Sequence, residues 1–425
     1  MRTVRSIWWG GLALLPVLAA TTVLGARPAA ADPPMSGVSA IAASTETACA
    51  LVADHQVRCW GRGSEGQIGD DNTSDAERAR RVENSTGSGP LVDVAQVVVG
   101  RFHACARTAD GTAWCWGQNA YGQLGDGTTD TRSRPVQVRN GLDNGPLTGV
   151  AQLSAGAGHS CARLADGRVA CWGRNNQGQL GDDTLTQHEL PNVVVDGDGI
   201  GPLTDVVQIA AGRWHTCARR AGGQVRCWGD DEVGQLGNGP AGDSLLPTAV
   251  LRPSGAGALG DVAQLALGDE HTCARLGSGQ ARCWGSNHDG ALGDGTEVDR
   301  QRPIVVQRPA GGPLTGIAQV ATGTEDHSCF RLASGRLRCT GSDDHGLLGR
   351  PSVGERSLLP VLVRNGSDTG ALGNVAQVVG GDDFTCARLT VGQVRCWGGN
   401  HRNQLGDGTD TDRPLPTPVY AQPLV

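Results

Sequence analysis

The sequence predicts an all-β fold, a seven-bladed β-propeller of four-stranded antiparallel blades with one disulfide in each blade. Three observations lead to this prediction. The 65 glycines and 21 prolines among 425 residues suit short strands joined by many turns rather than helices. The 14 cysteines fall into seven pairs, and the two members of each pair are ten positions apart. Successive pairs start 56 residues apart, or 57 before the last, so seven equal units account for residues 32–425.

The first 31 residues have the character of a secretory signal peptide. Arg2 and Arg5 precede an apolar run over residues 7–24, and three alanines at 29–31 form a small-residue cleavage site. A retained membrane anchor is the alternative, because the apolar run is nearly long enough to span a bilayer. The alanine-rich site favours cleavage. We therefore expect a secreted protein, extracellular or in the cell envelope, with no membrane span in its folded part at 32–425.

Residues 206–250 show the plan of one unit. An alternating apolar run, VVQIAAG, is followed by RWHTCARR and QVRCWG, then by the glycine-rich loop GQLGNG and the apolar stretch LPTAV. Alternation bounded by turn residues predicts four short strands, here called A to D in chain order. Seven such units indicate a closed propeller, with an open β-solenoid as the alternative. A ring needs no capping repeats and exposes few edge strands, which favours closure.

The repeated words AAG..HTCA, DG.V.CWG and GQLGDGT resemble those of the regulator of chromosome condensation repeat family. The resemblance covers essentially all of residues 32–425 and implies a seven-bladed propeller. Thr47 and Phe384 depart from the histidine position and Thr340 from the tryptophan position, while Ala291 and Leu347 alter the GQLG word, so we expect the loops of units five and six to deviate. The matching side chains are His103, His159, His215, His271 and His327, then Trp60, Trp116, Trp172, Trp228, Trp284 and Trp397.

Each cysteine pair is predicted to form a disulfide across the hairpin that joins strands B and C. If Cys161 faces Cys171, the turn is a three-residue loop that ends at Gly167. Such loops usually have a residue in the left-handed backbone conformation at this last position. Six units carry glycine there and the first carries His55. Directly opposed residues lie close enough for a disulfide, and an exported chain oxidises its cysteines. The predicted disulfides are Cys49–Cys59, Cys105–Cys115, Cys161–Cys171, Cys217–Cys227, Cys273–Cys283, Cys329–Cys339 and Cys386–Cys396.

Metal sites are the main alternative for these residue types. His159, Cys161 and Cys171 are plausible zinc ligands, but no C-x-x-C spacing occurs and disulfide sulfurs cannot bind zinc as thiolates. The aspartates of the GDGT loops are candidate calcium ligands, but their spacing is not that of an EF-hand. A role in capping turns explains these aspartates better. We expect neither a metal nor a cofactor.

Composition and motifs also bear on activity. A net charge of −7 provides no general basic field for nucleic acid. The chain has no lysine, which excludes Walker-type phosphate loops and Schiff-base catalysis. Neither a G-x-S-x-G nor an H-E-x-x-H motif occurs. We predict that the protein is not an enzyme.

The most variable positions of the repeat are the two residues between strands A and B. We expect these A–B turns to be exposed on one face of the ring, beside the long C–D loops, where they can bind a partner. Units two and four offer arginine with an aromatic residue, a combination typical of binding hot spots, and units five, six, seven and one offer acids. The predicted binding residues are Glu46, Arg101, Phe102, Arg213, Trp214, Asp269, Glu270, Glu325, Asp326, Asp382 and Asp383.

These observations favour a secreted, non-enzymatic module, or an inhibitor, that binds an unidentified extracellular protein. Binding of a cell-surface glycan or cell-wall component is the second hypothesis, although the aromatic content of 4% is low for stacking platforms. The family resemblance also raises guanine-nucleotide exchange, which the export signal disfavours. An enzyme on a propeller scaffold would have to rely on the acids of the A–B turns, without a base or nucleophile beside them.

Overall fold

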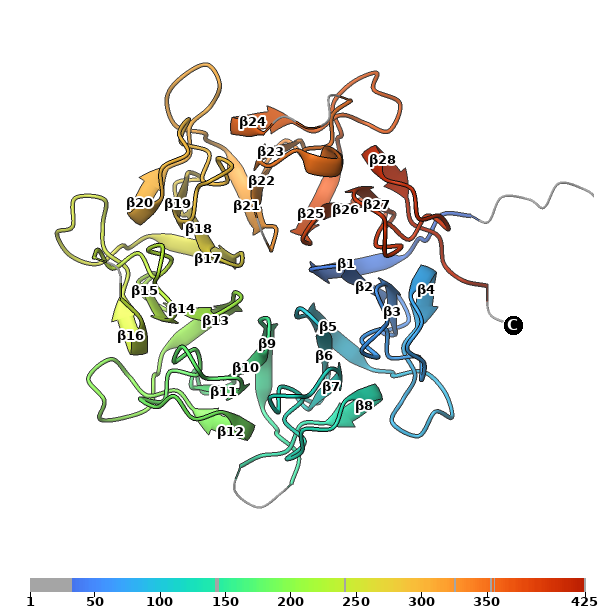
Figure 1. Cartoon of the computed structure of the whole chain (residues 1–425), viewed down its shortest axis with the longest axis vertical. Helices are drawn as coiled ribbons and strands as arrows, with labels where there is room; N and C mark the ends of the chain where they lie inside the picture. Colours follow the sequence, from blue (N-terminus) through green and yellow to red (C-terminus); the bar gives the residue numbers. More distant parts are fainter. Residues whose placement is uncertain are drawn as a thin grey trace, which may run out of the picture. The chain divides into compact units, whose positions relative to one another are not determined.

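The computed structural model describes residues 33–423, except 142–144, 241, 325, 352–353 and 355. These described residues form seven four-stranded antiparallel sheets, each made of four consecutive strands. Figure 1 shows the sheets as blades around a common centre, with the first strand of each blade innermost. The predicted seven-bladed propeller is confirmed. The predicted signal peptide, residues 1–31, lies outside the described residues.

The four strand positions recur in every blade with nearly constant length. The innermost strands A are β1 (Val38–Ser44), β5 (Val94–Val99), β9 (Val150–Ala155), β13 (Val206–Ala211), β17 (Val262–Leu267), β21 (Ile317–Thr322) and β25 (Val375–Gly380). Strands B are β2 (Thr47–Val52), β6 (His103–Thr108), β10 (His159–Leu164), β14 (His215–Arg220), β18 (His271–Leu276), β22 (His327–Leu332) and β26 (Phe384–Leu389). Strands C are β3 (Val57–Gly61), β7 (Ala113–Gly117), β11 (Val169–Gly173), β15 (Val225–Gly229), β19 (Ala281–Gly285), β23 (Leu337–Gly341) and β27 (Val394–Gly398). The outermost strands D are β4 (Ala76–Arg81), β8 (Arg132–Gln137), β12 (His188–Val193), β16 (Ser244–Ala249), β20 (Arg300–Val305), β24 (Ser357–Leu362) and β28 (Arg413–Pro418).

The ring closes without exchanging a strand between its first and last blades. β1 packs against β25 as well as against β5, so blade seven is adjacent to blade one. The Met35 amide donates to the Val419 carbonyl at 2.8 Å, and Pro34 bridges Tyr420. The same bonds form at the other junctions, where Leu91 donates to Val82. The two ends of the propeller therefore join as a normal blade connection does.

The B–C hairpins confirm the predicted turn and the predicted disulfides. Cys161 lies opposite Cys171 in the strand register, and their Cα atoms are 4.1 Å apart. All seven pairs are bonded, and no cysteine in the described residues is free. Gly167 has a φ of +84°, and His55 adopts the same left-handed region at 60°. The zinc alternative is excluded for these cysteines, because their sulfurs are covalently paired.

Side chains that recur in most repeats form hydrogen bonds between neighbouring blades. At the junction of blades four and five, the Trp284 indole donates to the Gln235 carbonyl at 2.9 Å. The Thr272 hydroxyl donates to that same carbonyl, and His215 Nε2 lies 2.9 Å from the hydroxyl oxygen. Since the hydroxyl proton is already used, the histidine donates. These tryptophans and histidines are fully buried scaffold residues rather than a surface site.

A glutamine in strand A provides a further link that the sequence reading overlooked. Gln208 donates to the Leu265 carbonyl and accepts from the Leu265 amide, both at 3.0 Å. It thereby satisfies backbone groups on the free edge of the next innermost strand, where no further strand can pair. Blade one has Ala40 at this position, so the clamp is missing at its junction with blade two. The clamping residues are Gln96, Gln152, Gln208, Gln264, Gln319 and Gln377.

The expectation of irregular loops in units five and six is half right. Blade six contains a short 3-10 helix, η1 (Asp344–Gly346), found in no other described loop. Blade five keeps the turns of its neighbours, because Asn287 still accepts the Leu292 amide as Asn119 accepts that of Leu124. Ala291 removes only a side-chain contact, so the loop conformation survives.

Candidate protein-binding face

The A–B turns and the C–D loops share one face of the ring. The first residue of each C–D loop donates its amide to the second residue of the same blade's A–B turn, as Arg62 does to Glu46 at 2.9 Å. The B–C turns are bonded instead to the start of the next blade, as in the Val94 amide to the His55 carbonyl. Strand connectivity thus places the variable A–B positions and the longest loops together.

The two residues of each A–B turn have different surroundings. The first residues, among them Arg101, Arg213 and Asp269, line a cavity of about 80 Å³ at the centre of the ring. The second residues point outward against the C–D loops, as the contacts of Glu46, Phe102 and Trp214 show. Glu325 lies outside the described residues.

The A–B turns, which we expected to be exposed, are partly covered. Thr45, Ala157 and Gly158 are buried, and every described residue of the predicted binding set is half-buried. The reason is that each turn packs against a C–D loop. Side chains at these positions are consequently held in defined orientations rather than projecting freely into solvent.

Two stacks of arginine and aromatic side chains dominate one half of the face. Two guanidinium groups contact the Trp214 ring: the Cζ atom of Arg174 is 4.1 Å from the ring centroid and that of Arg213 is 5.3 Å from it. Arg174 also lies 4.9 Å from the Tyr121 ring. At this spacing a guanidinium is attracted to the ring by cation–π interaction, worth about 0.5–1 kcal/mol at exposed sites. The stack therefore spans blades two, three and four.

A second, smaller stack joins blades one and two. The Phe102 ring has Arg62 at 4.8 Å and Arg101 at 5.3 Å from its centroid. Arg62 also pairs with Glu46 at 2.7 Å. The structure thus brings three predicted residues, Glu46, Arg101 and Phe102, together with Arg62, which was not predicted.

The sequence did contain a signal for the missed arginines. Arg62 and Arg174 each follow the glycine of a CWG word, and the other units have no arginine there. Each of the two comes one blade before an aromatic residue in an A–B turn, Phe102 and Trp214. Pairing these two variable positions across units would have predicted both stacks.

The predicted acidic arc is less negative than the sequence indicated. Glu46 is paired with Arg62 and with His401, whose Nε2 is 2.8 Å away. His401 also lies 3.1 Å from Asp383, and Arg213 lies 3.4 Å from Asp269. Arg62 and His401 come from C–D loops and Arg213 from the A–B turn of the preceding blade, so counting the acids of the A–B turns alone overstated the charge.

Two carboxyl groups of this arc titrate differently. Burial works to raise the pKa of Glu46, but hydrogen bonds from Arg62 and His401 outweigh it and the pKa is lowered. For Asp383, burial dominates and the pKa is raised, although Gln404 donates to the carboxylate at 2.8 Å. Among the other acids, Glu270 has no ion pair within the described residues, and Asp382 accepts from the Thr324 hydroxyl at 3.5 Å. Asp326 is half-buried at the same turn position.

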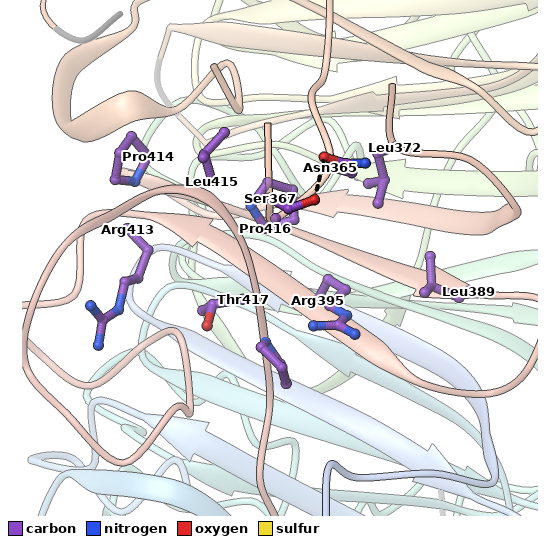
Figure 2. Close-up of a pocket in the computed structure, with 12 residues that line it drawn as sticks. Asn365, Ser367, Leu372, Leu389, Arg395, Arg413, Pro414, Leu415, Pro416 and Thr417 are labelled. Atoms are coloured by element: carbon purple, nitrogen blue, oxygen red, sulfur yellow. Dashed lines mark hydrogen bonds between the residues drawn. The ribbon is translucent and has the colours of Figure 1, made fainter. Parts of the chain in front are cut away.

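A larger hollow lies elsewhere, on the outer rim. Figure 2 shows it between the loop that leaves blade six, with Asn365 and Ser367, and the proline-rich strand β28 of blade seven. It encloses about 550 Å³. A similar recess of about 470 Å³ lies at blade two, lined by Pro90 and Trp114. These recesses arise where a D–A connection crosses the next blade, and they contain no constellation suited to catalysis.

Within the described ranges, no group of three or more histidine, cysteine, aspartate or glutamate residues could hold a metal ion. The GDGT aspartates act as turn caps: Asp126 accepts the Thr128 amide at 3.0 Å and pairs with Arg132 at 3.3 Å. No helix in the same part of the chain is long and apolar enough to cross a bilayer.

Sequence comparison agrees with this architecture. The profile of the RCC1-like domain matches residues 146–424, and profiles of the regulator of chromosome condensation (RCC1) repeat match 110–163, 38–67 and 94–123. The chain belongs to the RCC1-like propeller family. The ultraviolet-B receptor UVR8 of Arabidopsis thaliana is 28% identical over 393 residues, which cover 91% of this chain and 83% of the receptor.

Other relatives share a smaller part of their length or only the fold. The human protein HERC4, described as a probable E3 ubiquitin-protein ligase, is 31% identical over 233 residues, covering 55% of this chain and 21% of that protein. Human WBSCR16 superposes with a TM-score of 0.71 at 23% identity, over 86% of this chain and 93% of its own. Yeast RCC1 (Prp20), in a structure with Kap60 bound, gives 0.69 at 21% identity, over 96% and 91%.

Proposed function

We propose that this RCC1-like propeller is an exported, non-enzymatic module that binds a protein through the face formed by its A–B turns and C–D loops. The observation that carries the proposal is the pair of arginine–aromatic stacks on this face. Arginine, tryptophan, tyrosine and phenylalanine are enriched at the centres of protein interfaces. A protein of the same fold, yeast RCC1, is known in a complex with the protein Kap60.

The stacks are suited to binding because they are already ordered. Arg174 is held over Trp214 and donates to Asn176 through Nε. Neither Arg174 nor Arg101 has a carboxylate partner within the described residues. An arginine held in place loses less rotamer entropy when it pairs, so a carboxylate from a partner gains more of the interaction energy. The face thus favours a partner that presents acidic side chains beside apolar contact area.

Glycan binding finds less support here. A sugar ring stacks on a free aromatic face, but guanidinium groups flank Trp214 and Phe102. Enzymatic activity also finds less support, because the repeat histidines are buried in blade junctions and the cysteines form disulfides.

Export is supported by the signal-like segment at 1–31 and by the disulfides. A disulfide in every blade persists in an oxidising compartment outside the cytosol. N-terminal sequencing of the protein recovered from a culture supernatant should begin near Asp32. Recovery only from the cytosolic fraction, with the N-terminus intact, would contradict export.

The binding face is tested by differential capture from the culture supernatant. Immobilised wild type is compared with Arg213→Ala/Trp214→Ala, and with Asp166→Ala/Arg168→Ala as the control. The control pair is exposed and lies in a B–C turn on the opposite face. We expect a protein partner that the control retains and the first variant loses by at least tenfold. Equal capture by all three proteins, or capture of polysaccharide alone, refutes the assignment.

A further inference from the structure

The C–D loops of four blades share one polar arrangement. In blade two, Asn119 Oδ1 accepts the Leu124 amide at 2.9 Å, while Asn119 Nδ2 donates to Asp126 Oδ1 at 3.3 Å. The same asparagine–aspartate pair recurs as Asn175–Asp182, Asn287–Asp294 and Asn400–Asp407, with distances of 3.1, 3.3 and 3.2 Å. The asparagine thus ties the turn at Leu124 to a buried carboxylate of the same loop.

Each of these aspartates also has a basic partner at the start of strand D. The pairs are Asp126–Arg132, Asp182–His188, Asp294–Arg300 and Asp407–Arg413. Blades one and six reach the same result with different residues, through Asp70–Arg80 at 3.1 Å and Asp343–Arg350 at 2.6 Å. Five of the seven loops therefore place an arginine beside the acid, and the loop of blade three places His188 there.

The loop of blade four breaks this pattern at all three positions. Asp231 replaces the asparagine, Asn238 replaces the aspartate, and Ser244 replaces the basic residue. Asp231 Oδ1 still accepts the Leu236 amide at 2.9 Å. Asp231 is 0% exposed, yet its Oδ2 atom has no hydrogen-bond partner among the described residues, and the buried Oδ1 atom of Asn238 also has none.

Further acids lie beside Asp231. Asp230 and Glu232 flank Asp231, and Asp243 accepts the Asp231 amide at 3.1 Å. None of these acids forms an ion pair within the described part of the chain, although Gln235 donates to Asp230 at 2.8 Å. An anion here lacks compensating charge.

We propose that the C–D loop of blade four binds one calcium ion through Asp231 Oδ2 and Asn238 Oδ1, in place of the cation that five of the other loops carry in an arginine side chain. Calcium accepts carboxylate and amide oxygens in irregular geometry and completes its shell with water. Magnesium demands a near-ideal octahedron, which two side-chain oxygens in a loop do not impose. The proposal is independent of the protein partner proposed above.

The test measures calcium binding to the whole protein after treatment with EDTA. Isothermal titration with Ca²⁺ should give one equivalent, with a dissociation constant of about 10⁻⁴–10⁻³ M, as for calcium sites with few protein ligands. Asp231→Asn installs the residue found in four other blades, and Ser244→Arg installs their built-in cation. Both variants should weaken binding at least tenfold while far-ultraviolet circular dichroism stays unchanged.

The matched control is Asp183→Asn in blade three. Asp183 is an exposed acid of an equivalent loop, with a left-handed φ of 63° that asparagine also tolerates. Its calcium affinity should remain within twofold of wild type. The proposal fails if wild type shows no saturable binding of one equivalent, or if Asp231→Asn binds calcium as wild type does.

Discussion

Replacing His215 with phenylalanine should make the propeller less sensitive to acid. His215 is fully buried, and burial lowers its pKa to about 3, with smaller contributions from His271 and His159. Its Nε2 donates to Thr272, while Nδ1 has no hydrogen-bond partner among the described residues. Protonation would therefore place both a charge and an unsatisfied donor in the junction between two blades.

The size of the effect follows from linkage between folding and protonation. A histidine in the unfolded chain has a pKa near 6.5. Below that pH the histidine is therefore protonated in the unfolded state but stays neutral in the folded state. Stability is thus lost as pH falls from about 7 toward the folded pKa. At pH 5 the loss from one such histidine is about 2 kcal/mol, since each pKa unit corresponds to about 1.4 kcal/mol.

Phenylalanine is a natural occupant of this position, since Phe384 fills it in blade seven and is fully buried. The free energy of unfolding is measured by urea titration at pH 8 and pH 5 for wild type and His215→Phe. The variant loses the hydrogen bond to Thr272 at both pH values, so this cost cancels in the difference. We expect the fall between pH 8 and pH 5 to be about 2 kcal/mol smaller in the variant.

His288 provides the control, because its side chain is 69% exposed. His288→Phe should leave the pH dependence unchanged within about 0.5 kcal/mol, the usual range for surface substitutions. If His215→Phe loses as much stability as wild type over the same pH range, His215 is not held neutral by burial and the reasoning is wrong.

Two further predictions concern the scaffold. Gln208→Ala leaves the Leu265 amide and carbonyl without their side-chain partner, so the free energy of unfolding should fall by about 1–3 kcal/mol, whereas the exposed Gln187→Ala should change it little. Equal stability of the two variants would show that water replaces the clamp without loss. Removing the Cys161–Cys171 bridge with a double alanine variant should cost about 2–3 kcal/mol, because the closed loop is short. Mass spectrometry with thiol labelling should find six intact disulfides in this variant and no free thiol in wild type.

Local features of the chain made the fold predictable. The spacing of ten between cysteines, with glycine at the left-handed turn position, fixed the hairpin register of Cys161 and Cys171 before any tertiary contact was considered. The loop of blade five shows that a change in a repeated motif does not by itself change the loop conformation. Its altered GQLG word predicted a deviation, but Asn287 and Leu292 make the bond that sets the turn, and they are retained.

The candidate site was predictable only in part. The sequence indicated which turns vary and that Phe102 and Trp214 are aromatic, and connectivity placed them on one face. It did not predict that Arg62 and Arg174 stack on those rings from the preceding blade. Strands and turns are set by neighbours along the chain, whereas these contacts depend on how tightly one blade packs against the next.

The sequence by itself determined the number of blades, the strands within each blade and the disulfides, because each depends on spacing within one repeat. Only the tertiary structure decided which side chains are partners on the proposed binding face. His401 reaches Glu46 across 355 positions of the chain, because closure of the ring brings blade seven beside blade one. The Glu46 carboxylate thereby gains a hydrogen-bond partner that the sequence does not reveal, since such pairing depends on distance in space rather than distance along the chain.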